Sequence, residues 1–204
     1  IDKVSFLEKV GVFNDSFNKN IKLWGNYNTL NNVPLVRNID VYYLGFWQRE
    51  TLYDRQEIKA TELRHSIGTR IANNKANWFY DFEALYQFGK IGSQNIQAWT
   101  LSAYNYYHLK NLKFSPTISL KADIISGNLN YNDESIETFN PLFPKGAYFG
   151  WSGFIGPSNL IDIHPGVNFE VNSKLNIAFD SVLFWRYSKN DGLYAPNFQL
   201  LISG

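Results

Sequence analysis

The stretch Trp78 to Phe88, WFYDFEALYQF, constrains the fold most, because it carries two carboxylates among aromatic and aliphatic side chains. Every second residue is apolar or aromatic: Trp78, Tyr80, Phe82, Ala84, Tyr86 and Phe88. The alternate positions include Asn77, Asp81, Glu83 and Gln87. Successive side chains of a β-strand point to opposite faces, so the pattern predicts a two-faced strand with both acids on its polar side. A helix would leave those acids within its apolar stripe.

The same alternation recurs along the chain and predicts about ten strands of the length that a membrane barrel uses. Clear segments are Glu62 to Ile71, Phe114 to Asp123, Ile161 to Val171 and Lys174 to Tyr187, and weaker ones are Val4 to Val12, Ile21 to Leu30, Ile39 to Trp47, Asn95 to Leu109 and a last strand near Phe198. Full charges lie on the polar side of nearly every segment. The apolar sides carry almost none, with His65, Asn105 and Ser181 as the main exceptions.

The connections between these segments alternate between two kinds. Short turns are expected near residues 31–37, 73–76, 110–113 and 172–173, and loops that are longer or richer in Gly and Pro near 13–19, 50–60, 89–94, 127–158 and 189–197. An up-and-down meander brings every second connection to the same end, and outer-membrane barrels pair short periplasmic turns with long external loops. Pro116 would cost a ladder hydrogen bond inside a strand, so we expect it beside a turn.

Composition excludes several other classes of protein. The chain has no cysteine, which removes disulfides and thiol chemistry, and its net charge of +1 gives no basis for nucleic-acid binding. Aromatic residues make up 17% of the chain, as suits strands and membrane interfaces. No apolar run approaches the roughly 18 residues of a transmembrane helix. The chain starts at Ile1 and has no Met, so we expect a processed chain or an excerpt of a longer one.

Several stretches resemble successive landmarks of the alginate-export family. They are LWGNY at 23–27, DVYYLGF at 40–46, RHSIGTR at 64–70, WFYDFEALYQFG at 78–89, TFNPLFP at 138–144, GPSNLIDIHP at 156–165 and FWRYSKNDGLY at 184–194. The resemblance implies a monomeric outer-membrane porin of about eighteen strands that passes a linear anionic polysaccharide through a charged lumen. We therefore expect residues 1–204 to form one all-β domain, an antiparallel up-and-down transmembrane β-barrel that lacks its N- and C-terminal strands. Closure as a ten-stranded barrel is the alternative.

The polar faces supply the candidate site. An Arg side chain presents a planar fork that can hold a carboxylate bidentately, and a conduit needs several weak sites rather than one tight site. The predicted lumenal residues are Arg64, Arg70, Lys121, Arg186, Asp81, Glu83, Asp123 and Asp180. The resemblance implies that arginines near Arg64, Arg70 and Arg186 line the conduit. Alternatively, these cations only neutralise acids on neighbouring strands.

The longest loop, residues 127–158, combines acids with more aromatic side chains than a solvated loop needs. We expect its TFNPLFP segment to pack against the rim or to fold into the pore. The predicted gating residues are Phe139, Asn140, Pro141, Phe143 and Pro144. A simple external cap without gating is the alternative.

No catalytic, metal or cofactor site is predicted. Asp81 and Glu83 lie roughly 6 to 7 Å apart along a strand, a spacing common among strand neighbours, and the three histidines are scattered. The expected partners are an anionic polysaccharide and outer-membrane lipid. The alternatives in function are a plugged outer-membrane barrel with a receptor, adhesive or structural role, a general porin for small solutes, and a soluble β-sandwich or lipocalin-like carrier.

Overall fold

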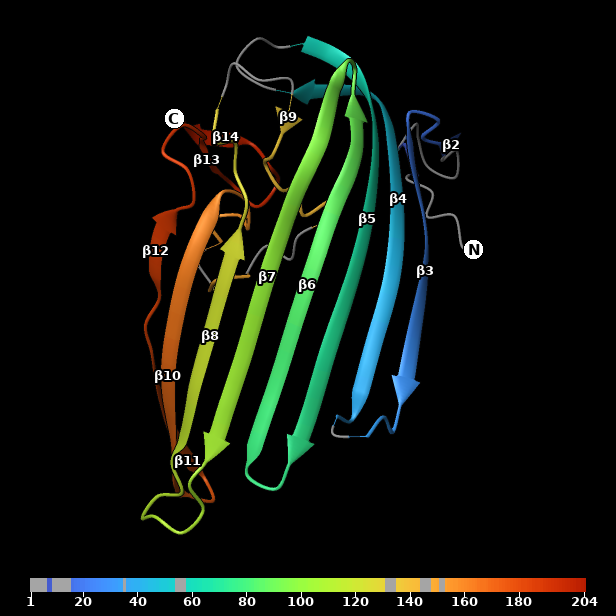
Figure 1. The fold of residues 1–204 in the computed structure, drawn as a ribbon. Coiled ribbons are helices and arrows are strands. Elements are labelled where there is room, and N and C mark those ends of the chain that lie inside the picture. The colour runs from blue at the N-terminus through green and yellow to red at the C-terminus, as the bar shows by residue number, and fades with distance from the viewer. Residues whose placement is uncertain are drawn as a thin grey trace.

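The computed structural model describes residues 7–8, 16–34, 36–53, 58–130, 135–143, 148–150 and 153–204, which form an all-β protein (Figure 1). None of these residues belongs to a helix long and apolar enough to cross a membrane. The strands are β1 (Leu7–Glu8), β2 (Ser16–Phe17), β3 (Ile21–Asn31), β4 (Asn38–Tyr53), β5 (Ile58–Lys75), β6 (Trp78–Ile91), β7 (Gln94–His108), β8 (Thr117–Ile125), β9 (Ser135–Ile136), β10 (Leu160–Asn172), β11 (Leu175–Asp180), β12 (Leu183–Arg186), β13 (Leu193–Tyr194) and β14 (Leu200–Ile202).

The main sheet follows the order β11-β10-β8-β7-β6-β5-β4-β3, and all neighbours on this path are antiparallel. In addition, β12 pairs with β10, and β9 pairs in parallel with β7. Figure 1 shows a tall curved wall with β3 at one edge and β11 and β12 at the other. The two edges are not paired with each other, so the sheet is open. The predicted fold class is confirmed, as part of a barrel wall.

Both ends of the chain differ from the prediction. Of the strand expected over Val4 to Val12, only Leu7 and Glu8 lie within the described residues, and they pair with β2 in a small separate sheet. The last strand, β14, pairs with β13 and does not join the wall. The strand expected over Lys174 to Tyr187 is divided at Ser181 and Val182 into β11 and β12, which continue along the same partner, β10.

The tight connections at residues 32–37, 76–77, 109–116 and 173–174 lie at one end of the wall, as predicted. Pro116 immediately precedes β8, and its carbonyl oxygen accepts a hydrogen bond from the Leu109 amide at 2.8 Å. The connections expected at 50–60 and 89–94 are shorter than predicted. Strand pairing continues to Tyr53 opposite Ile58. It also continues to Ile91 opposite Gln94, where Gly92, with φ of 58°, lets the chain reverse within two residues.

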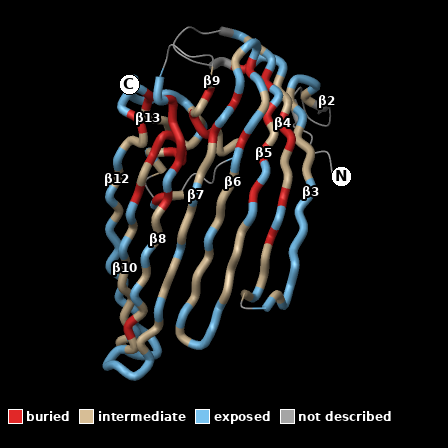
Figure 2. The backbone as a smooth tube through the Cα atoms, viewed as in Figure 1, coloured by how far each residue is buried: buried red, intermediate tan, exposed pale blue. Residues whose placement is uncertain are grey.

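The two faces of the wall are inverted relative to those of a soluble protein. Ile67 and Leu101 are 51% and 47% exposed on the outer face, whereas Glu62, Arg64 and Asp123 are buried on the inner face. Soluble proteins bury aliphatic side chains and expose charged ones. Figure 2 shows that the buried residues gather in the upper half of the wall, under the loops. An apolar outside over a polar inside is the arrangement of a lipid-facing barrel.

The outer apolar face has the height of a bilayer core. Trp78 and Phe88 lie ten residues apart on β6, and both are exposed. Ten strand residues extend for about 33 Å, which corresponds to roughly 25 Å across the membrane at a tilt of about 40°. Aromatic residues therefore stand at both borders of an apolar band of the expected thickness.

We predict that Gly89→Ala destabilises the wall by about 1–3 kcal/mol, because a side chain there is strained and has no room. Gly89 has φ of 137°, and an added Cβ would lie 2.0 Å from the carbonyl oxygen of Leu63 on β5. Urea unfolding in lipid vesicles measures the change. Gly150→Ala is the matched control, since Gly150 has φ of 152° but nothing within 4 Å of an added Cβ. Equal destabilisation by both variants would show that the contact with Leu63 has no effect.

Candidate functional site

Strand register assembles a row of polar residues across the inner face. Side by side on neighbouring strands lie Asp40, Arg70, Glu83, Ser102, Asp123 and Asp162, from β4 to β10. We call these six residues the acidic row. Side chains directly opposite each other on paired strands lie about 5 Å apart at Cβ, so they act on each other electrostatically. Four carboxylates and one guanidinium therefore share one level of the wall.

Arg70 is the accessible cation of the acidic row. Its Nε donates to Asp81 Oδ1 at 2.7 Å, a second nitrogen binds the other oxygen of Asp81, and Nη1 lies 3.8 Å from Asp40 Oδ2. Tyr27 donates to Asp40 Oδ2 at 2.8 Å, which places a phenol beside the same cation. The Arg70 side chain is 41% exposed. It is held bidentately by an acid and still faces open space.

Two tyrosines support the acids of this region. Tyr42 donates to Glu83 Oε1 at 2.5 Å, and its ring stacks on Tyr27 at 5.2 Å between centroids. The Tyr42 ring lies over Gly68, where an added Cβ would come within 2.2 Å of it. Glycine at position 68 thus makes room for the ring that orients Glu83.

Arg64 lies in a different environment, nearer the loop end of β5. Its side chain is 1% exposed, Nε donates to Glu62 Oε1 at 2.6 Å, and Nη1 donates to Gln87 Oε1 at 2.8 Å. Thr51 donates to the second oxygen of Glu62 at 2.9 Å. This buried network satisfies the Arg64 charge, as a desolvated ion pair requires.

The segment Phe139–Phe143 lies against this network. Gln87 Nε2 donates to the Asn140 carbonyl oxygen at 2.7 Å, and the Asn140 amide donates back to Gln87 Oε1 at 3.0 Å. Phe143 packs edge-on against Phe46 of β4, with 6.2 Å between ring centroids. We call the Gln87–Asn140 pair the latch. Pro144, the last of the predicted gating residues, lies outside the described residues.

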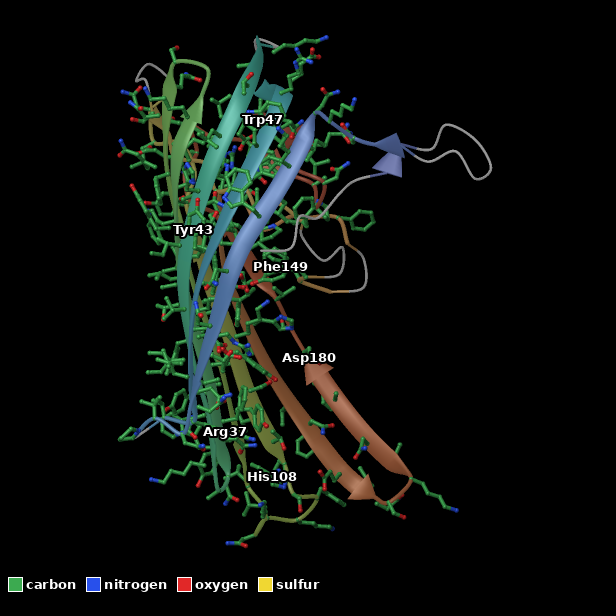
Figure 3. All side chains as sticks on the ribbon, turned by 90° about the vertical axis from the view of Figure 1, so that its right-hand side faces the viewer. Arg37, Tyr43, Trp47, His108, Phe149 and Asp180 are labelled. Atoms are coloured by element: carbon green, nitrogen blue, oxygen red, sulfur yellow. The ribbon has the colours of Figure 1, made fainter. Side chains whose placement is uncertain are left out.

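The other end of the acidic row is covered by residues 148–149 of the long loop. Lys121 Nζ lies 3.3 Å from Asp123 Oδ2 and 3.7 Å from the centre of the Tyr148 ring. Figure 3 shows Phe149 on the concave side of the wall, between the strands of the two edges. Asp162 faces Asp123 across the paired strands, fully buried and with no hydrogen-bond partner for either carboxyl oxygen.

Arg186 and Asp180 lie apart from the other predicted residues, on β12 and β11. Arg186 donates to the carbonyl oxygens of Asp191 and Ser203, at 3.2 and 3.4 Å. The Asp191 carboxylate in turn accepts from the Asn128 amide, the Thr138 hydroxyl and the Tyr194 hydroxyl, so this region ties the long loop to the chain after β12. Asp180 is exposed at the end of β11 (Figure 3). Its carboxylate lies over Gly166 of β10, where an added Cβ would be 2.5 Å from Asp180 Oδ1.

A family model described as alginate export matches residues 19–199, which is most of the chain. The chain belongs to the alginate-export family. Members of this family are outer-membrane channels for polysaccharide, and the family is one of transport proteins rather than enzymes. No curated protein matches the sequence.

In this member of the alginate-export family, the wall brings together five of the eight predicted lumenal residues. They are Arg70 on β5, Asp81 and Glu83 on β6, and Lys121 and Asp123 on β8, with β7 between the last two strands. Sequence reasoning missed Asp40, Asp162 and Gln87 as site residues. The sequence could have predicted Asp40, because it lies on the face opposite Val41 and Tyr43 in the alternating segment DVYYLGF. No sequence pattern predicts the contact of Gln87 with a loop 53 residues away. Among the described residues, no group of three acids or histidines could hold a metal ion.

Proposed function

We propose that this chain forms part of the wall of a bacterial outer-membrane channel through which an anionic, alginate-like polysaccharide diffuses. The observation that carries the proposal is the inverted wall, with exposed aliphatic side chains outside and the acidic row inside. Membership of the alginate-export family supports it independently. The proposal includes a monomeric barrel, lipid around its apolar band and no enzymatic step.

Arg70 would give the polymer a weak binding site. Its guanidinium is 41% exposed while it holds Asp81, so a uronate carboxylate can compete with that acid for the same fork. Asp40 and Glu83 lie beside Arg70 in register and repel a bound carboxylate. Because attraction by Arg70 and repulsion by the two acids act at the same level, a polymer carboxylate stays bound only briefly. Short binding is what a polymer needs if it is to move through the channel.

Arg64 would act only after the loop moves. Phe139–Phe143 and the latch cover the Arg64 network in this structure, so the buried guanidinium is not accessible to a passing polymer. We propose that the segment gates the conduit and that its release exposes Arg64. Arg186, which binds two backbone carbonyl oxygens, would instead position the loops.

The proposed channel makes a prediction for planar lipid bilayers. The full-length barrel should show brief current blocks by alginate oligomers, with a frequency proportional to their concentration. Neutral dextrans of matched length should block roughly tenfold less often, because the site selects carboxylates through Arg70. If alginate and dextran blocked the current equally often, the channel would not recognise the anionic polymer. The result would instead favour a general porin for small solutes.

A second function is favoured by the seating of Phe139–Phe143 on the inner face. A barrel plugged in this way would serve as a receptor, an adhesin or a structural protein. Conductance before and after deletion of residues 139–143 separates the two functions. A plugged barrel should have almost no conductance until the segment is deleted, whereas a channel should conduct both before and after the deletion.

A further inference from the structure

The outer face carries an ordered group of residues that the conduction of a polymer does not use. One row across β3 to β6 consists of Lys22, Trp47, Leu63 and Lys90, which lie opposite one another in register. Both lysines are exposed, and Lys22 Nζ lies 4.7 Å from the centre of the Trp47 ring. Exposed Arg49 follows Trp47 by two residues. We call Lys22, Arg49 and Lys90 the cationic rim.

Aromatic side chains lie directly below this row. The next row toward the turn end consists of Trp24, Gly45, His65 and Phe88, again in register. The Trp24 ring covers Gly45, and His65 stacks on Phe88 at 5.2 Å between centroids. Tyr43 binds His65 Nδ1 through its hydroxyl at 2.7 Å, and Figure 3 shows Tyr43 below Trp47 on the wall. Such belts mark the level of the lipid headgroups.

An apolar hollow of about 480 Å³ lies farther down the same face. Its floor is the cross-strand pair Thr69 and Ala84, and its walls include Val41, Ile67, Tyr86 and Leu101. The pair lies six residues from the row of Leu63 and Lys90, which is about 20 Å along tilted strands and roughly 15 Å across the membrane. One leaflet of hydrocarbon is about 15 Å thick. An acyl chain whose headgroup is at the rim would therefore end in the hollow.

We propose that this face binds one phosphorylated, acylated glycolipid of the external leaflet, with its phosphates on the cationic rim and an acyl chain in the hollow. The proposal rests on the orientation of the proposed function, in which the loop end is external. Lys22 and Lys90 are separated by three strand spacings, or about 14 Å. A headgroup with two phosphates at its opposite ends can place one phosphate beside each lysine in its extended conformation. Glu50 adjoins Arg49, but the three cations leave the patch net positive.

Native mass spectrometry of the full-length barrel in nonionic detergent tests this site with purified diphosphoryl lipid A as the probe. The wild type should retain one lipid A molecule, and the triple variant K22Q/R49Q/K90Q should bind it at least roughly tenfold more weakly. Ala84→Leu fills the floor of the hollow without a change of charge, and it should weaken binding severalfold. Monophosphoryl lipid A should bind the wild type less tightly than the diphosphoryl form.

The matched control is K110Q/K113Q/K174Q, which removes three exposed lysines at the turn end. Lys113 also lies over an aromatic ring, 4.9 Å from the centre of Phe114, and this variant should bind lipid A like the wild type. Equal losses in the two triple variants, no retained lipid in the wild type, or equally tight binding of phosphatidylglycerol would each overturn the proposal. Conductance and ion selectivity should stay unchanged in every rim variant. If the wild type binds lipid A but does not conduct, the proposed channel function is refuted and the proposed lipid site is not.

Discussion

Replacement of Arg70 by Gln should shift the ion selectivity of the channel toward cations more than any other single substitution of the predicted lumenal cations. Arg70 is exposed, pairs with Asp40 and Asp81 and lies opposite Glu83, so its loss leaves three neighbouring carboxylates without a nearby arginine. A low-dielectric wall focuses this field, and we expect the ratio of chloride to potassium permeability to fall roughly threefold or more. Reversal potentials in a salt gradient measure the ratio, and the change should shrink at high salt.

Two other arginines serve as controls for this result. Arg37→Gln makes the same change of charge in the exposed turn before β4 (Figure 3), about 10 Å along the strand from Asp40, and should change the selectivity far less because solvent and salt screen it. Arg64→Gln should have little effect while the loop covers it, because Arg64 is buried and paired. If all three variants shifted the reversal potential equally, the selectivity would reflect total charge and not the position of Arg70.

Replacement of Gln87 by Leu should open the channel by releasing the latch. The amide of Gln87 binds the Asn140 amide and carbonyl and also accepts from Arg64. Leucine has a similar size but leaves these buried groups without partners, and each such group costs about 1–3 kcal/mol. A loss of about 2 kcal/mol changes the ratio of closed to open loops by roughly thirtyfold. We expect longer open times, a larger mean conductance and faster protease cleavage of the loop.

Gln97→Leu is the matched control for the latch. Gln97 is exposed on β7, opposite Phe88 and thus on the outer face, so the same chemical change there lies on the side of the sheet away from the latch. Combining Gln87→Leu with Arg64→Gln should reveal an effect of Arg64 on selectivity that the single variant lacks. A Gln87→Leu channel with unchanged open times and loop cleavage would mean that Phe139–Phe143 is not held by the latch.

The two-faced strands were predictable because the period of side-chain direction is local. The alternation in WFYDFEALYQF placed Asp81 and Glu83 on one face, and strand pairing in the structure keeps them there. The positions of loops were harder to predict from glycine residues. Gly89 and Gly92 favoured a loop at 89–94, yet Gly89 lies within a paired strand and Gly92 forms a two-residue turn. A glycine permits a positive φ, but the pairing partners decide which element uses it.

The sequence by itself determined which residues lie on the polar face, since that depends only on whether their positions in a strand are odd or even. Only the tertiary structure decided which of them meet. Register across β4 to β10 joined Asp40 to Arg70 and Asp123 to Asp162, and loop folding brought Asn140 to Gln87. The burial of Arg64 and the exposure of Arg70, two arginines on the same face of one strand, follow from that loop. Contacts between distant segments depend on packing over the whole wall, which no local pattern encodes.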